Sequence, residues 1–130
     1  MSREIKFRAW YMPFGPKGSM QEMLYRKASS ILAFAEMSPD NYIVEQFTGL
    51  KDKNGKEIYE GDILAWHSNI YRKHDWVGLV LYRGAGFAVQ ESDKSYSSPE
   101  WLDCACRKDV NIVEVIGNIH KNPELLEEDK

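Results

Sequence analysis

Apolar and polar residues alternate at the start of the chain, which is typical of a strand with one buried face. Ile5, Phe7 and Ala9 are separated by basic residues, so we predict a first strand over residues 4–10. Residues 13–18 contain two prolines and two glycines, which interrupt regular structure and predict a loop.

The stretch from Gln46 to Trp66 joins two apolar segments through a turn. Its centre is Asp52-Lys53-Asn54-Gly55, and Asn followed by Gly provides the two positive φ angles that a type I′ hairpin turn requires. Apolar residues stand on both sides of the turn, with Phe47 before it and Ile58 after it. We therefore predict a β-hairpin whose first strand begins near Tyr42.

Two further reversals follow the central hairpin. Glu60-Gly61-Asp62 predicts a turn, and the apolar run at 63–66 predicts a buried strand. Residues 76–82 and 87–90 then predict a second hairpin, whose four-residue connection contains two glycines.

The last third of the chain predicts two more strands and a helix. Trp101-Leu102 and residues 110–119 are apolar enough to form the final strands. Asn122-Pro123 predicts the start of a short terminal helix, because Asn caps helices and Pro fits the first turn.

Residues 20–37 are compatible with two structures. Met, Leu and Ala recur there at helical spacing, but residues 31–35 are also short and apolar enough for a buried strand. We predict a helix for part of this stretch, followed by a turn at Pro39-Asp40-Asn41.

Short strands, tight turns and few helices predict a mainly β fold, that is, a β-rich α+β protein. The expected architecture is a small, strongly bent antiparallel sheet or a partly open SH3-like barrel with short helices, including one at the C-terminus. The length of 130 residues predicts one domain over residues 1–130.

Three blocks of the sequence resemble the YopX family of small phage and prophage proteins. They are residues 3–10 (REIKFRAW), residues 48–63 (TGLKDKNGKEIYEGDI), and residues 113–120 with 122–126 (VEVIGNIH and NPELL). The resemblance implies a single YopX-like domain from a phage or prophage. It implies no catalytic residue, because no activity is assigned to the family.

Composition and charge narrow the class of protein. The chain is 43% apolar and has a formal net charge of −3, which argues against a broad cationic surface for duplex DNA. The sequence contains neither an apolar run long enough to span a membrane nor a visible signal peptide. We therefore expect residence in the host cytoplasm.

One cluster combines aromatic and basic residues, namely Trp66, Tyr71, Arg72, Lys73 and Trp76. Aromatic rings can stack on bases while Arg and Lys contact phosphates, so the cluster is a candidate surface for single-stranded nucleic acid or for a protein partner. The alternative is that both tryptophans are core residues at strand ends.

Carboxylates and thiols offer the other candidate chemistry. Glu57, Glu60 and Asp62 could hold a divalent metal for hydrolysis, although the spacing does not fit a calcium-binding loop. Cys104 and Cys106 would point the same way on a strand, but a zinc site lacks a second cysteine pair. We predict no metal, no cofactor and no catalytic residue.

These observations favour a non-catalytic binding module whose partner is an unknown protein or single-stranded nucleic acid. Open sheet edges also allow association between copies of the chain. The alternative is a small metal-dependent hydrolase or nuclease that uses the clustered carboxylates.

Overall fold

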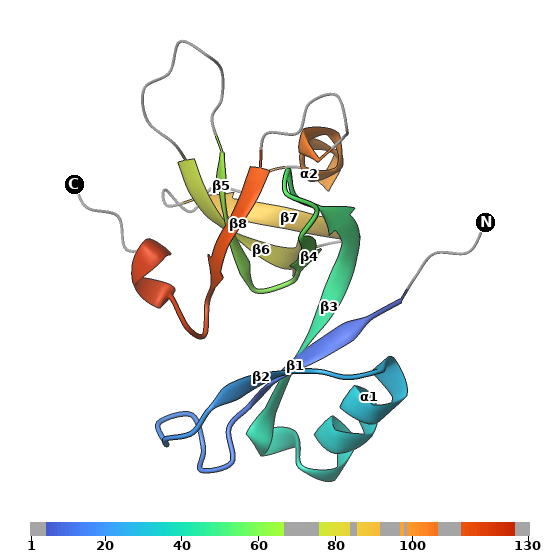
Figure 1. The fold of residues 1–130 in the computed structure, drawn as a ribbon, viewed down its shortest axis with the longest axis vertical. Helices are drawn as coiled ribbons and strands as arrows, with labels where there is room; N and C mark the ends of the chain where they lie inside the picture. The colour runs from blue at the N-terminus through green and yellow to red at the C-terminus, as the bar shows by residue number, and fades with distance from the viewer. Residues whose placement is uncertain are drawn as a thin grey trace. The chain divides into compact units, whose positions relative to one another are not determined.

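The computed structural model describes residues 5–66, 76–83, 86–91, 97, 99–106 and 113–126. Strands dominate, and they form two four-stranded antiparallel sheets, of which the second curls into a half-barrel (Figure 1). The prediction of a mainly β fold with short helices is confirmed. None of the helices in the described part of the chain is long and apolar enough to cross a membrane.

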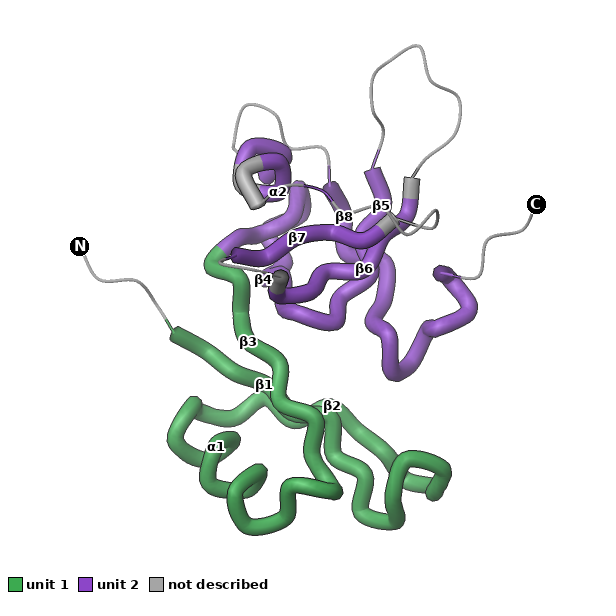
Figure 2. Tube along the Cα trace, turned by 180° about the vertical axis from the view of Figure 1, so that it is seen from behind, with its two compact units in different colours: residues 1–49 green, residues 50–130 purple. Residues whose placement is uncertain are grey.

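The chain divides into two compact units, residues 1–49 and residues 50–130 (Figure 2). The expectation of a single domain over residues 1–130 stays a prediction.

In unit 1, the central strand β1 (Phe7–Tyr11) lies between β2 (Glu22–Tyr25) and β3 (Tyr42–Lys51), and both pairings are antiparallel. The predicted first strand and the strand beginning at Tyr42 are confirmed. Residues 22–25 were open to a helical interpretation, and they form a strand because they pair with β1 in register, Trp10 opposite Met23. Pairing with a neighbour has overridden the local helical preference.

The predicted helix occupies the second half of the ambiguous stretch, as α1 (Ala28–Met37). It packs against β1, where Ala9 and Ile31 are fully buried. The short 3₁₀ helix η1 (Pro39–Asn41) then confirms the predicted turn and returns the chain to β3.

The predicted central hairpin joins β3 to its neighbour β4 (Glu57–Tyr59), but the turn is not type I′. The Asp52 N–H donates to the Lys56 carbonyl at 2.8 Å, and the Gly55 N–H donates to the Asp52 carbonyl at 3.0 Å. Gly55 has a φ of 83°, whereas Asn54 does not have the positive φ that type I′ requires. The loop therefore has three residues and ends in a left-handed glycine.

In unit 2, the predicted reversal at Glu60-Gly61 leads into β5 (Asp62–Trp66), which is a buried strand as expected. The second sheet has the order β7-β6-β5-β8, with β6 at Trp76–Arg83, β7 at Gly86–Glu91 and β8 at Val113–Asn118. The predicted second hairpin is confirmed, but Arg83 pairs with Gly86, so its connection has two residues rather than four.

The core of unit 2 is one cluster of buried apolar residues. Its fully buried members come from β4 to β8 and from the helix α2 (Pro99–Ala105), and they are Ile58, Leu64, Val80, Val89, Leu102 and Val113. Trp66 and Trp101 pack together at the edge of this cluster, with ring centroids 5.0 Å apart.

The prediction that Trp101-Leu102 forms a strand is wrong, because these residues lie in α2. Leu102 and Ala105 are both buried, and a spacing of three residues places them on one face of a helix but on opposite faces of a strand. Pro99 fits the first turn of the helix, where its missing N–H has no consequence.

The terminal helix is present as a single 3₁₀ turn, η2 (Pro123–Leu126). Asn122 precedes it as predicted, and the Asn122 carbonyl accepts the Leu125 N–H at 3.0 Å. The Asn122 side chain, however, accepts the Asn118 N–H at 3.3 Å, so it ties η2 back to the end of β8.

Candidate protein-binding surface

Among the residues that the structure describes, most of the exposed large apolar side chains belong to unit 1. Single exposed apolar residues are ordinary on globular proteins, whereas a group of them on one face marks an interaction surface. Among the described residues of this unit, the exposed large apolar side chains are Ile5, Phe14, Met20, Tyr25, Leu32, Met37 and Ile43.

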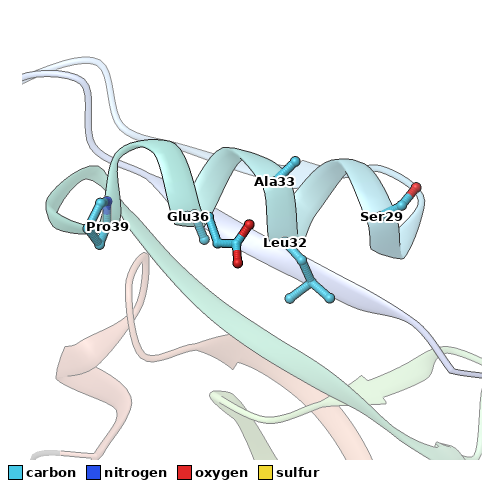
Figure 3. Close-up of a pocket in the computed structure, with 6 residues that line it drawn as sticks. Ser29, Leu32, Ala33, Glu36 and Pro39 are labelled. Carbon is cyan, nitrogen blue, oxygen red and sulfur yellow. The ribbon is translucent and has the colours of Figure 1, made fainter.

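The outer face of α1 is the best-defined part of this surface. An open groove of about 570 Å³ is lined by α1 and η1, with Ser29, Leu32, Ala33, Ala35, Glu36 and Pro39 as its wall. Leu32 and Glu36 project from the same flank of the helix (Figure 3). Leu32 is 44% exposed, which is unusual on a helix face that ought to be polar.

The inner face of α1 is held on the sheet by packing. Phe34 stacks over Tyr42 with ring centroids 6.0 Å apart, and Tyr42 stacks over Tyr11 at 4.8 Å. Burial raises the pKa of Tyr42, and the neighbouring Tyr11 adds to the rise. With Ile31 buried beneath it, the helix has one face fixed to the sheet and the other exposed.

A second exposed apolar feature is the loop between β1 and β2. The Gln21 side-chain amide donates to the carbonyls of Pro16 and Gly18 at 2.9 and 3.0 Å, while its oxygen accepts the Trp10 indole N–H at 2.8 Å. These bonds give the loop a defined shape. Phe14 and Met20 project from it with 67% and 75% of their surface exposed.

Met20 also has a φ of 64°, the one positive value among the described non-glycine residues. A residue with a side chain adopts this conformation at some cost in energy. The loop therefore holds an exposed apolar side chain in an unfavourable backbone conformation.

The structure brings only part of the predicted basic-aromatic cluster together. Trp66 is 6% exposed and belongs to the core, which is the alternative that the sequence left open. Trp76 is opposite Trp66 in the pairing of β5 with β6. Tyr71, Arg72 and Lys73 lie outside the described residues, so a binding role for the cluster stays a prediction.

Two of the clustered carboxylates, Asp62 and Glu57, contact Tyr59 of their own unit. Asp62 is 2% exposed, and its Oδ2 accepts the Tyr59 N–H at 2.8 Å across the turn between β4 and β5. Glu57 accepts a hydrogen bond from the Tyr59 hydroxyl at 3.5 Å. No group of three or more His, Cys, Asp or Glu residues in the described ranges is arranged to hold a metal ion, so the hydrolase alternative receives no support.

The two cysteines do not lie on a strand, where they would have pointed the same way. Cys104 lies in the last turn of α2, and Cys106 follows the helix. Residues two apart on a helix point in different directions, which agrees with an exposed Cys104 and a half-buried Cys106 packed against the core. The pair therefore does not present two thiols to one ligand.

Comparisons with known proteins agree with the resemblance noted in the sequence. The sequence model of one family, YopX protein, matches residues 6–127, which is nearly the whole chain. The chain belongs to the YopX family. No curated protein matches it.

A solved structure is also similar to this YopX-family chain. It is the crystal structure of protein EF1440 from Enterococcus faecalis, which is 29% identical in sequence with a TM-score of 0.54. The match covers 96% of this chain and 99% of that one. The likeness therefore extends over both units.

The central YopX-like block stabilises the fold through Asp52. This side chain is 6% exposed and accepts three backbone N–H groups. Its Oδ1 accepts those of Asn54 and Lys56 at 2.8 and 2.9 Å, and its Oδ2 accepts that of Val115 at 2.9 Å. One carboxylate thus shapes the hairpin loop and attaches it to β8.

The first and last YopX-like blocks also supply structural contacts. In the first, Arg8 forms a buried ion pair with Glu45, with Nε and Oε1 2.8 Å apart. In the last, the Asn118 side chain accepts the N–H groups of His120 and Lys121, both at 2.9 Å. Each of the three blocks therefore supplies at least one polar side chain that holds the fold.

Sequence reasoning missed the outer face of α1 because the pattern of residues 20–37 does not show where the strand β2 ends and the helix begins. Once the helix is placed at residues 28–37, the signal is visible in the sequence. Of its ten residues, Glu36 alone is charged, although one whole face of the helix meets solvent.

Proposed function

We propose that this YopX-family chain is a non-catalytic module, encoded by a phage or prophage, that acts in the host cytoplasm by binding a protein. The surface that binds is the outer face of α1. The proposal depends on the groove along Leu32, Ala33 and Glu36. This groove is open and mainly apolar, and the opposite face of α1 is packed on the sheet.

The hydrogen bonding of the buried polar side chains favours a binding function over a catalytic one. Within the described part of the chain, every buried side-chain nitrogen or oxygen has a hydrogen-bond partner. Asp52 and Asp62, the most buried carboxylates of the central block, bind backbone N–H groups of their own unit. Each of these carboxylates therefore has a structural role within its own unit.

Charge supports a protein over nucleic acid as the partner of this face. Glu36 is the charged residue of α1, and a carboxylate repels phosphate. Leu32 and Ala33 are suited to apolar contact with another side chain. The prediction of nucleic-acid binding depends instead on Arg72 and Lys73, which are remote in sequence from this helix.

Site-specific photocrosslinking tests the proposal in cells that express the chain naturally. A benzophenone amino acid replaces Leu32, and after irradiation the adducts are separated by size and identified by mass spectrometry. The control places the same group at Ile116 in β8, which is 37% exposed against 44% for Leu32.

We expect a discrete protein adduct from position 32 and none, or a weaker one, from position 116. The same adduct should disappear when Ala33→Glu is added, because a second carboxylate would enter the groove. Absence of a protein adduct at position 32, or an equal yield from both positions, would refute the proposed function.

A further inference from the structure

We propose that the protein bound by the outer face of α1 is a second copy of this chain, whose own α1 packs against it in the antiparallel direction. The two-fold axis passes between Leu32 and Ala33, so Ser29 of one copy lies opposite Glu36 of the other. This inference rests on the proposed function and names the partner of the same surface.

The residues on this face have the spacing of a helix-packing seam. Ser29, Leu32, Ala33 and Glu36 stand at positions i, i+3, i+4 and i+7, which form one stripe along a helix. All four are exposed, and the stripe is turned away from the buried Ile31. Ser29 and Ala33 are small, so two such helices can approach closely, and Leu32 of each copy then covers Ala33 of the other.

Charge selects the antiparallel direction. Arg26 and Lys27 precede α1, whereas Glu36 lies in its last turn and Asp40 follows it, and all four are exposed. A parallel pair would place like charges together. An antiparallel pair places the cations of each copy beside the carboxylates of the other, so the surface is complementary to itself.

The same charges are unfavourable within a single copy. A helix favours carboxylates at its N-terminal end and cations at its C-terminal end, because of its dipole. α1 has neither an acidic residue in its first turn nor a basic residue in its last, and the side chain of the N-cap residue Lys27 makes no capping hydrogen bond. In the antiparallel pair, Glu36 of the second copy supplies the missing negative charge near Ser29.

The size of the contact predicts a weak dimer. A helix of ten residues is about 15 Å long, and a pair of such helices buries well under the ~1,200 Å² typical of stable complexes. Dimerisation should therefore depend on protein concentration and weaken as salt rises.

Cysteine crosslinking of the purified full chain tests the orientation. Cys104→Ser and Cys106→Ala first remove the native thiols, and circular dichroism checks the fold of this background. Three samples are then oxidised with copper phenanthroline. The first contains Ala33→Cys alone, the second contains Ser29→Cys alone, and the third contains equal amounts of Ser29→Cys and Glu36→Cys.

We expect dimers from Ala33→Cys, which lies beside the axis, and from the Ser29→Cys and Glu36→Cys mixture. Ser29→Cys alone should not link, because the two copies of residue 29 are about 10 Å apart along the axis, beyond the ~7 Å limit between Cα atoms. Efficient linking of Ser29→Cys alone indicates a parallel pair, and no linking of any variant indicates no pair. Either result overturns the proposal.

Sedimentation velocity of the native sequence gives a second, independent readout. From ~10 to ~500 μM at low salt, we expect the weight-average sedimentation coefficient to rise towards that of a dimer. Glu36→Lys should weaken the association tenfold or more, because it places Lys beside Lys27 of the other copy. The double variant Lys27→Glu/Glu36→Lys should recover most of this loss.

Lys17→Glu is the matched control, since it makes the same charge change as Lys27→Glu on an exposed residue away from α1. It should leave the association unchanged. A chain that stays monomeric throughout, or charge variants that all behave like the control, overturns the inference. The proposed function then survives only if position 32 still crosslinks to a different protein in cells.

Discussion

Replacing Asp52 by Asn should destabilise unit 2, although the substitution changes one atom. The Asp52 carboxylate accepts three backbone N–H groups, two within the hairpin loop and one from Val115 in β8. An Asn side chain has only one acceptor oxygen. If that oxygen keeps the two loop bonds, the amide NH₂ group faces the Val115 N–H, and two donors are left opposed.

The expected cost follows from these contacts. A hydrogen bond to a charged group contributes about 1.5–3 kcal/mol, and a buried donor without an acceptor costs about 1–3 kcal/mol. Because Asp52 is 6% exposed, water can replace little of the loss. We expect Asp52→Asn to lower the free energy of unfolding by about 2–3 kcal/mol, against a total of about 5–15 kcal/mol for a typical domain.

Urea unfolding followed by tryptophan fluorescence measures this difference, and amide hydrogen exchange locates it. Exchange should accelerate at Val115 in Asp52→Asn, because that amide has lost its acceptor. Glu114→Gln is the matched control. Glu114 pairs with Lys53 at 3.8 Å, but both side chains are 44% exposed, so the control should cost less than about 1 kcal/mol.

The interpretation of Asp52 fails if Asp52→Asn stays within about 0.5 kcal/mol of the wild type, the usual range for a neutral surface substitution. It also fails if the loss is real but Val115 exchanges at its original rate. In that case the destabilisation arises within the loop, and the hairpin is not attached to β8 by this side chain.

Three other predictions follow from particular residues. Gly78→Ala should destabilise by about 1–3 kcal/mol in urea, because the new Cβ would lie 2.3 Å from Val89 Cγ1, and Gly78→Ala/Val89→Ala should recover part of the loss. Burial raises the pKa of Tyr42, so the stabilisation from its neutral hydroxyl is present below about pH 10 and is lost as pH rises through the folded-state pKa. In urea titrations at alkaline pH, Tyr42→Phe should therefore lose less stability than the wild type does. If the basic-aromatic cluster binds single strands, Arg72→Ala/Lys73→Ala should elute from immobilised oligodeoxythymidine at lower salt, and a wild-type chain that is not retained at low salt would refute that prediction.

Much of the fold could be predicted because its signals are local. The hairpin around Gly55 is an example, since a turn residue between two apolar segments restricts the chain whatever surrounds it. The type of its loop depends also on the Asp52 side chain. This side chain accepts the N–H groups of Asn54 and Lys56 and so favours a loop of three residues over one of two. A side chain that bonds its own backbone is hard to weigh from the order of residues alone.

The candidate site was not predictable in the same way. The sequence directed attention to Trp66 and the basic residues after it, and Trp66 lies in the core. Apolar residues alone do not distinguish a buried face from an exposed one. Which face of α1 is covered depends on where β1 and β3 place the sheet beneath it.

By itself, then, the sequence determined the class of fold, the strand that begins at Tyr42 and the reversals at Gly55 and Gly61, because turn chemistry and alternation act over a few residues. Tertiary structure decided that residues 22–25 form a strand, that residues 99–105 form a helix and that Leu32 stays exposed. The physical reason is that each of these outcomes depends on a part of the chain that is distant in sequence. β1 supplies backbone hydrogen bonds to residues 22–25, and the core of unit 2 buries one face of residues 99–105. The sheet of unit 1 covers a different face of α1 from the one that carries Leu32.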